Sequence, residues 1–418
     1  MNTTAKASAS IINPASGLAT TLTAARDQAW AWMQQHLALL IVLAVLAVLA
    51  VAVVTGVLRS RRAARRRWYA GARLVTVLPP AGLDPAAAVA GARRLWWDLP
   101  SLAPPRWKRL LTGLPHLTVE YHLTAGEDLA VRMWLPGPIS THRLSTALRA
   151  AWPGTLVLDH PAPTSPQPTP PQPAPSPAEP AAARLMVAGG TVRPERPEHL
   201  PLRVPDPRDD AADPVRTLEA VAGQLADGEA AVVQILARPA VGRRLRAYRR
   251  TVDRLHDGRP ARRSPLLSIV LAVVRALLDI VTDPTSTAHH GERAVRRLDP
   301  QQAEELRDIR AHKLQPQWEV ALRYYAATTA RGPDAIARVR GIADSLFGAF
   351  ALLAGRNALA RHRLPQPRAV VAARRLRRGA LLSATELAAL AHLPARTDAL
   401  SGGRARSVPA PPHTTRRL

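Results

Sequence analysis

The sequence predicts an α+β protein in which one N-terminal transmembrane helix precedes two tandem units, both built in the order β-α-β-β-α-β and the second with a helical insertion. Three observations support this prediction. They are an uncharged apolar run near the N-terminus, the same succession of strand-like and helix-like apolar periods in two later regions, and a proline-rich segment between those regions. The chain of 418 residues has room for all of these parts.

The apolar run LALLIVLAVLAVLAVAVVTGVL, residues 37–58, contains no charged residue and is long enough as a helix to span the ~30 Å hydrocarbon core of a bilayer. Arginines crowd the juxtamembrane segment 59–71, whereas segment 1–36 has only Lys6 and Arg26 as basic residues. The positive-inside rule therefore predicts a single-pass protein of the cell (inner or plasma) membrane, with segment 1–36 outside and the bulk of the chain in the cytoplasm. A cleaved signal peptide is the alternative, but the run is too long, begins too late and has its positive charges on the wrong side.

The juxtamembrane arginines are expected to set this topology and to contact anionic lipid of the cytoplasmic membrane. They are Arg59, Arg61, Arg62, Arg65, Arg66 and Arg67. A second apolar run, residues 266–281, is interrupted by Arg275 and Asp279, and a charge at the centre of a bilayer costs at least ~2.5 kcal/mol. We expect this run to form a buried or surface-lying helix rather than a second span.

The first unit, residues 72–160, alternates between strand and helix patterns. Apolar residues in LTVEYHL and LAVRMWL recur at every second position, as in half-buried strands, and Asp84-Pro85 is a typical helix start. The expected elements are a strand at 73–78, a helix from Asp84, strands at 117–123 and 129–135, a helix capped by Ser140, and a strand at 155–158. This order is the ferredoxin-like arrangement.

The second unit, residues 183–365, repeats this order after a linker at 161–182, in which half of the residues from 161 to 180 are proline. Such a segment favours an extended polyproline spacer; a ligand for an SH3-type domain is the alternative. The expected elements are a strand at 183–188, a helix from Asp213, a strand at 229–237, a helical insertion at 241–315, a strand at 318–325, a helix through 336–350, and a strand near 356–364. A helical junction at 366–394 and a disordered tail at 395–418 complete the expected organisation.

Composition and motifs argue against enzymatic chemistry. The chain has no cysteine, and all but three of its 57 lysines and arginines are arginine, so no lysine stands in a phosphate-loop context. His289-His290 lacks a third ligand at useful spacing, and Gly189-Gly190 lacks the rest of a dinucleotide fingerprint. We expect Asp98, Glu120 and Glu319 to lie on the surface or at strand edges. The sequence thus predicts a protein that is not an enzyme and has no catalytic, cofactor or metal residues.

The net charge of +26 raises the question of an anionic partner. A GC-rich genome explains part of the arginine excess, so the positions of the arginines say more than their number. One cluster, residues 243–254, is predicted on a helix. The other is the candidate for nucleic-acid contact: Arg374, Arg375, Arg377 and Arg378. For both, the alternatives are a solvated helical face and contact with phosphate. Tryptophans cluster in the first unit, where core packing or an oligomer interface is favoured over base stacking: Trp96, Trp97, Trp107, Trp134 and Trp152.

The segment LLSATELAALAHLP, residues 381–394, predicts a well-bounded helix. Ser383 and Glu386 have the spacing of a capping box, and Pro394 ends the helix. Together with EAAVVQILARPA (229–240) and AGRNALARHRL (354–364), this segment resembles the N-terminal, membrane-anchored, non-motor region of conjugative DNA-transfer and type IV secretion coupling-type ATPases of actinobacterial and other Gram-positive mobile elements. The segment AAWPGT (150–155) is similar to the N-terminal region of related secretion ATPases.

In that family a motor domain of the FtsK–HerA type follows the segment, but no lysine occurs here after Lys313, so no ATP-hydrolysing residue can be assigned. The resemblance implies either an accessory chain whose motor ATPase acts in trans or a truncated product of a longer gene. We therefore expect a membrane-anchored scaffold of a conjugative, type IV secretion-like apparatus, forming a homo-oligomer through the partner ring and passing DNA toward the membrane. The alternatives are a membrane-tethered nucleic-acid-binding protein unrelated to secretion and a fragment without function of its own.

Overall fold

The computed structural model describes residues 37–102, 104–126, 129–161, 185–206, 213–256 and 300–395, together with Arg26, Trp30, Gln34 and Gln35. The apolar run 266–281, His289-His290, the tail 396–418 and nearly all of the linker and of segment 1–36 lie outside these residues. The chain divides into two compact units. The N-terminal unit comprises Met1–Arg65 with Leu110–Gly113, and the sheet unit comprises Arg66–Arg109 with Leu114–Leu418. The sheet unit contains most of the first predicted repeat and the whole of the second.

The N-terminal unit contains most of α2 (Leu37–Ala70), a continuous helix that includes the predicted span and the arginines after it. Its part from Ala44 to Ala70 is long and apolar enough to cross a membrane, and none of its most apolar stretch is buried within the protein. The helix therefore does not end at residue 58, and the juxtamembrane arginines lie on its C-terminal turns.

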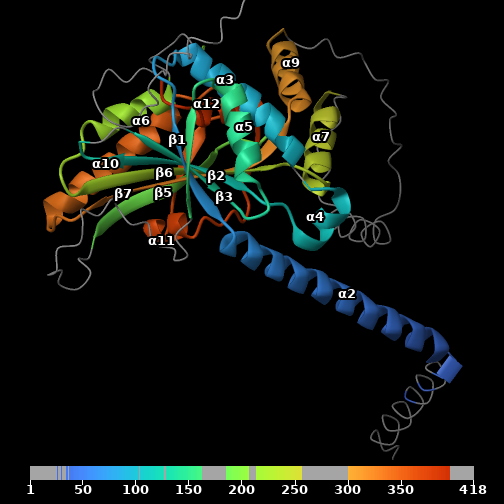
Figure 1. Ribbon diagram of the computed structural model, residues 1–418. Helices are drawn as coiled ribbons and strands as arrows, with labels where there is room; N and C mark the ends of the chain where they lie inside the picture. Colours follow the sequence, from blue (N-terminus) through green and yellow to red (C-terminus); the bar gives the residue numbers. More distant parts are fainter. Residues whose placement is uncertain are drawn as a thin grey trace, which may run out of the picture. The chain divides into compact units, whose positions relative to one another are not determined.

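The sheet unit is built on one antiparallel sheet in the order β4-β1-β3-β2-β6-β7-β5-β8, with β9 paired to β7 (Figure 1). The first four strands of the chain are β1 (Arg73–Leu78), β2 (Leu117–Thr124), β3 (Ala130–Leu135) and β4 (Leu156–Pro161). The remaining strands are β5 (Met186–Pro194), β6 (Glu229–Pro239), β7 (Gln317–Thr328), β8 (Leu359–Arg363) and β9 (Ala380–Ser383).

The two halves of this sheet have the same internal order. The first half runs β4-β1-β3-β2, and the second, read from its outer edge, runs β8-β5-β7-β6. The helices between strands correspond as well, with α3 (Pro85–Asp98) and α5 (Thr141–Ala151) matched by α6 (Pro214–Ala222) and α10 (Pro333–Ala351). Strands β2 and β6 pair from Leu117↔Ala237 to Thr124↔Ala230, so the two halves share one continuous sheet.

One face of the sheet carries the main core, formed with α3, α5, α6, α10 and α12 (Ala384–Leu390) (Figure 1). The opposite face is covered over β5 and β7 by α11 (Pro367–Ala372), where Val371 packs with Tyr325. Because side chains alternate along a strand, Tyr324 belongs to the main core while its neighbour Tyr325 lies under α11. The other helices are η1 (Leu99–Leu102), α4 (Arg106–Thr112), α7 (Arg243–His256) and α9 (Pro300–Leu314).

Most helix starts follow the expected capping chemistry. Asp84 accepts hydrogen bonds from the backbone of Ala86 and Ala87, and Asp213 accepts one from Val215. Ser140 occupies the expected position before α5 but makes no side-chain cap bond, so the predicted cap bond is wrong there. The capping box of Ser383 and Glu386 is confirmed, although Leu381–Ser383 belong to β9 and not to a helix.

The tryptophans divide between core and surface. Trp96, Trp134 and Trp152 are buried, whereas Trp97 and Trp107 are 52% and 61% exposed. The core-packing interpretation therefore holds for the first three only. Trp96 lies 5.1 Å from Trp318 in an edge-to-face contact, which links the two halves of the sheet.

Two of the carboxylates expected on the surface are buried. Glu120 is 1% exposed and Glu319 is 7% exposed, so that prediction is wrong for both, while Asp98 is exposed. The alternation of β2 and β7 points both buried carboxylates away from the main core, toward the face that the strand pattern alone leaves to solvent. The chain around α11 contributes to covering this face, and arginines neutralise both carboxylates.

Candidate functional site

The arginine cluster after α11 is split between two roles, and Arg374 has a structural one. Its backbone is left-handed, with φ of 45°, and its guanidinium donates to both carboxylate oxygens of Glu120 at 2.7 and 2.9 Å. Its carbonyl accepts a hydrogen bond from Tyr69 at 2.9 Å and lies 2.7 Å from a ring nitrogen of His116. Arg374 is therefore held inside the protein, and its side chain already has a carboxylate partner.

Glu120 is the counter-charge at the centre of that arrangement. Burial alone raises the pKa of its carboxyl, but the hydrogen bond from His122 and the charge of Arg374 outweigh burial and hold the pKa well below its usual range. The amide of Gln234 also donates to Glu120 at 2.9 Å. The carboxylate thus stays ionised and fully hydrogen-bonded, as a buried charge requires.

The other arginines of this cluster, Arg375, Arg377 and Arg378, line a basic cavity of about 780 Å³ in the sheet unit. The walls come from β5, β7, α11 and the loops that follow β5 and α11. Six arginines line it: Arg193, Arg196, Arg323, Arg375, Arg377 and Arg378. The lining holds one carboxylate, that of Glu198, which already accepts a bond from Arg244 at 2.6 Å. We refer to this feature as the basic cavity.

Arg323 is the most deeply placed of these arginines, at 9% exposed. Its guanidinium donates to the carbonyls of Arg375 at 2.7 Å and Val370 at 3.5 Å, and within the part of the chain that the structure describes it pairs with no carboxylate. Burial lowers the pKa of Arg323, and the charges of Arg377 and Arg193 lower it further, against an opposing contribution from Tyr69. A guanidinium remains protonated even so, which makes Arg323 a buried positive charge balanced only by carbonyl dipoles.

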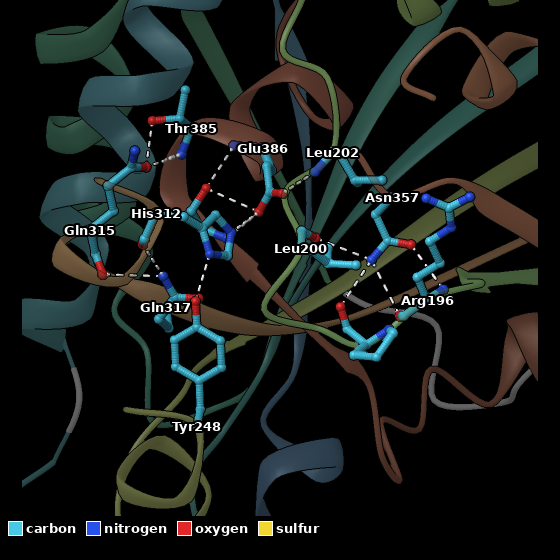
Figure 2. A network of polar contacts seen from close by, with 12 residues as sticks. Arg196, Leu200, Leu202, Tyr248, His312, Gln315, Gln317, Asn357, Thr385 and Glu386 are labelled. Atoms are coloured by element: carbon cyan, nitrogen blue, oxygen red, sulfur yellow. Dashed lines mark hydrogen bonds and ion pairs between the residues drawn. The ribbon is translucent and has the colours of Figure 1, made fainter. Parts of the chain in front are cut away.

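The loop after β5, which carries Arg196 and Glu198 to the cavity, is fixed by Asn357 (Figure 2). The Asn357 side chain accepts from the backbone of Arg196 at 2.9 Å and donates to the carbonyls of Pro197 and Leu200 at 3.2 and 3.1 Å. Asn357 is buried, so these bonds form in a low-dielectric setting. The loop that brings Arg196 and Glu198 to the basic cavity is therefore tied to a buried side chain that lies outside the cavity.

A second polar centre, the closed network, lies around Glu386 (Figure 2). The Glu386 carboxylate accepts bonds from the backbone of Leu202 and from the backbone and hydroxyl of Ser383, at 2.7, 2.7 and 3.0 Å. One of its oxygens also lies 2.5 Å from Nε2 of His312. Tyr248 approaches the other ring nitrogen at 2.6 Å, and burial together with the charges of Glu386 and Glu198 raises the pKa of its hydroxyl.

His312 joins the two ends of the closed network. Its Nε2 lies beside the Glu386 carboxylate, which accepts from all its other partners, so Nε2 is the donor there. Its Nδ1 lies beside the Tyr248 hydroxyl, and the tautomer of the ring sets which of the two donates. Serine, histidine and glutamate occur together here, but the carboxylate lies between the other two, and all three are buried. A nucleophilic serine needs the histidine as its direct partner, so this network joins α7, α9 and α12 instead of preparing a nucleophile.

The structure places the sequence-predicted arginines as follows. Arg375, Arg377 and Arg378 meet in the basic cavity, while Arg374 does not take part in its lining. On α7, Arg244 bonds Glu319 and Glu198, and Arg249 and Arg250 are exposed. The juxtamembrane arginines all lie on α2, exposed except for the half-buried Arg61: Arg59, Arg61, Arg62, Arg65, Arg66 and Arg67.

Sequence reasoning missed Arg193, Arg196 and Arg323. Arg193 and Arg323 lie on strands, and Arg323 stands between Leu322 and Tyr324, whose side chains point into the main core. That alternation was a usable signal, because it places Arg323 on the second face of β7. The pairing of β5 with β7, which brings the two strands together, follows from the predicted ferredoxin-like order and not from the pattern of either strand alone.

Neither a protein-family model nor a curated protein matches this chain. Among the described residues, no group of three histidine, aspartate or glutamate side chains lies close enough to hold a metal ion. The basic cavity, with its excess of positive charge, is the strongest candidate for a binding site in the described part of the chain.

Proposed function

We propose that the chain is a single-pass membrane scaffold that positions a motor ATPase of the FtsK–HerA type at the cytoplasmic membrane, as an accessory component of a conjugative, type IV secretion-like DNA-transfer apparatus. In this proposal the N-terminus lies outside, the sheet lies in the cytoplasm, and copies of the chain assemble around the partner ring. We also assign each half of the sheet to the ferredoxin-like fold, which the matching strand orders support.

The attachment of the last turn of α2 to the sheet is the observation that carries the proposal. The carbonyl of Trp68 accepts a bond from Gly137 at 3.0 Å, and the ring of Tyr69 lies 5.1 Å from that of Trp134. A Cβ on Gly137 would lie 3.1 Å from the Cα of Gly71, so the backbones meet closely there. The residues that directly follow the juxtamembrane arginines are therefore already part of the folded unit that holds the sheet, and a scaffold that begins at the membrane surface needs this.

The segment that resembles the family's junction packs inside this chain. Leu387, Ala388 and Leu390 of α12 are buried, and the carbonyl of Ala391 accepts a bond from Trp96 at 3.0 Å. The carbonyl of His392 accepts a bond from Tyr121 at 2.7 Å. These contacts support a stable body that joins both halves, with the motor meeting the outside of that body and not α12 itself.

Fractionation of cells that carry both proteins tests this function. We expect a motor ATPase encoded on the same DNA element to sediment with membranes when the full chain is present, and to become soluble when residues 37–58 are deleted. The variant Ser140→Cys, in a chain without native cysteine, should react with a membrane-impermeant maleimide only after lysis. A motor that sediments equally without the chain, or labelling of the introduced thiol in intact cells, would contradict the proposal.

The basic cavity favours a second function, a membrane-tethered nucleic-acid-binding protein. Binding of single-stranded DNA would then weaken steeply with salt, because each neutralised phosphate releases counterions. Replacing Arg375, Arg377 and Arg378 with alanine would reduce the salt slope by about 0.7 for each phosphate that is no longer neutralised. Binding that does not depend on salt would exclude this second function.

A further inference from the structure

We propose that the basic cavity binds a compact ligand that carries at least two adjacent phosphates, of the class of nucleoside diphosphates and triphosphates. The proposal does not depend on the scaffold function, since it rests on the cavity alone. Four features of the cavity support it: its charge, the depth of Arg323, its rim, and its size and apolar wall.

The first feature is the charge balance. Six arginines and one carboxylate line the cavity, and that carboxylate, Glu198, is already engaged by Arg244. Two strongly buried carboxylates of the sheet unit have cationic partners: Glu120 has Arg374, and Glu319 has Arg238 and Arg244. Pairing of this kind is the usual condition for a buried charge. Arg323 departs from it, since it bonds carbonyls and no carboxylate among the described residues, and phosphate oxygens would supply the missing negative charge.

The second feature is the depth of Arg323. At 9% exposed it is the least exposed of the lining arginines, while Arg193, Arg375, Arg377 and Arg378 are exposed. A guanidinium presents donors in a fixed fork that fits phosphate oxygens. One phosphate could therefore contact Arg323 while a neighbouring phosphate contacts the rim. The backbone of a DNA duplex is convex and would meet the rim without reaching a recessed side chain.

The third feature is the origin of the rim arginines. Arg193 comes from β5, and Arg377 and Arg378 come from the loop after α11, so the arginines face the cavity from separate elements. The loop is anchored at Arg374 by its bonds to Glu120, and the carbonyl of Arg377 accepts a bond from Arg238 at 3.4 Å. Such anchoring reduces the entropy cost of ordering these residues around a ligand.

The fourth feature is the size and the apolar part of the wall. A volume of about 780 Å³ falls within the ~300–1,000 Å³ range of small-molecule sites. Pro194, Leu364 and Ala369 line the cavity with the arginines, and they offer an apolar surface to a flat ring. Inorganic pyrophosphate would use only the arginines, whereas a nucleotide would use both parts, so the apolar wall favours a nucleotide.

The test is calorimetric titration of the full chain in uncharged detergent with ADP, ATP, GDP, GTP, pyrophosphate, adenosine and 5′-unphosphorylated single-stranded DNA. We expect nucleoside diphosphates or triphosphates to bind more tightly than pyrophosphate, and adenosine to show no binding. Arg377→Ala combined with Arg378→Ala should weaken the nucleotide by about tenfold or more. The matched control, Arg249→Ala with Arg250→Ala, removes the same charge from the exposed face of α7 and should leave affinity within about twofold, as screened distant charges do.

Separate outcomes support or overturn the proposal. Pyrophosphate bound as tightly as the nucleotides would overturn the nucleotide assignment, because the apolar part of the wall would then contribute nothing to binding. Equal weakening by both double variants would overturn the proposal, because it would indicate net charge and not the cavity. Binding of 5′-unphosphorylated single-stranded DNA with no nucleotide binding would also overturn it, in favour of nucleic acid. A second variant, Arg323→Met, should abolish nucleotide binding, with its thermal unfolding midpoint reporting whether it still folds.

Discussion

The closed network and the basic cavity differ in how their buried charged groups are compensated, although both lie on the same sheet. In the closed network, the Glu386 carboxylate meets four donors from Leu202, Ser383 and His312, and every partner is buried. In the basic cavity, Arg323 meets two carbonyls and faces more arginines. The first arrangement serves stability, because removing any member leaves a buried polar group unpaired. In the second, the charges of Arg377 and Arg193 act against the buried charge of Arg323, an arrangement that a bound anion would relieve.

The largest expected effect is the loss of Glu386. Glu386→Ala should lower the free energy of unfolding by about 3–5 kcal/mol, since His312, Ser383 and the backbone of Leu202 would all lose their acceptor in a buried site. Urea unfolding of the detergent-solubilised chain, followed by tryptophan fluorescence, measures this change. The control Asp98→Ala removes an exposed carboxylate and should stay within about 0.5 kcal/mol. A loss of less than about 1 kcal/mol for Glu386→Ala would show that the network is not structural.

The next effect concerns the contact between α3 and the end of α12. Trp96→Phe removes the donor to the carbonyl of Ala391 and should cost about 1–3 kcal/mol, because that carbonyl is buried with α12. Trp97→Phe, at the exposed neighbouring position, is the matched control and should change stability by less than about 0.5 kcal/mol. Equal effects of the two variants in the same unfolding assay would refute the role assigned to the α12 contact.

The pH dependence of stability is the third test. The folded-state pKa values of His122 and Glu120 both lie below their ordinary values; burial dominates for His122, and the bonds from His122 and Arg374 outweigh burial for Glu120. The unfolded chain therefore binds more protons than the folded one, and stability should fall as pH drops below about 6.5 and again below about 4.5. His122→Gln should reduce the first decline and leave the part that comes from His199, whose pKa is also lowered by burial, as urea midpoints at pH 7.5 and pH 5.5 would show. A wild-type midpoint that rises toward pH 5.5 would contradict the sign.

Much of the fold was readable from local pattern. Residues 73–78 form β1 with the predicted bounds, and the Asp84, Asp213 and Ser383 caps are confirmed, because capping is a local interaction between neighbouring residues. The joining of two halves through β2 and β6 was not readable, since any strand edge offers the same backbone groups and the choice between edges depends on tertiary packing.

The candidate site was readable only in part, for the same reason. Arg375, Arg377 and Arg378 are close in sequence and were predicted as a group, but nothing local separated them from Arg374, which turns inward to Glu120. Glu120 itself was predicted at the surface, because the alternation of β2 shows which side chains avoid the main core and not what covers the other face. Arg323 joins the cavity through pairing between β5 and β7, which lie far apart in the chain.

The smallest expected change in stability is the one that sharpens the comparison most. Arg377→Ala should alter the free energy of unfolding by no more than about 0.5 kcal/mol, because the side chain is exposed and no ion pair involving it is found among the described residues. The direction should be stabilising at low salt, since Arg377 acts on the buried charge of Arg323, and the gain should disappear as salt screens the repulsion. Unfolding curves at low and high salt, with Arg249→Ala as the control, would detect this. A destabilising Arg377→Ala would place Arg377 in the same structural class as Glu386 and remove the contrast between the basic cavity and the closed network.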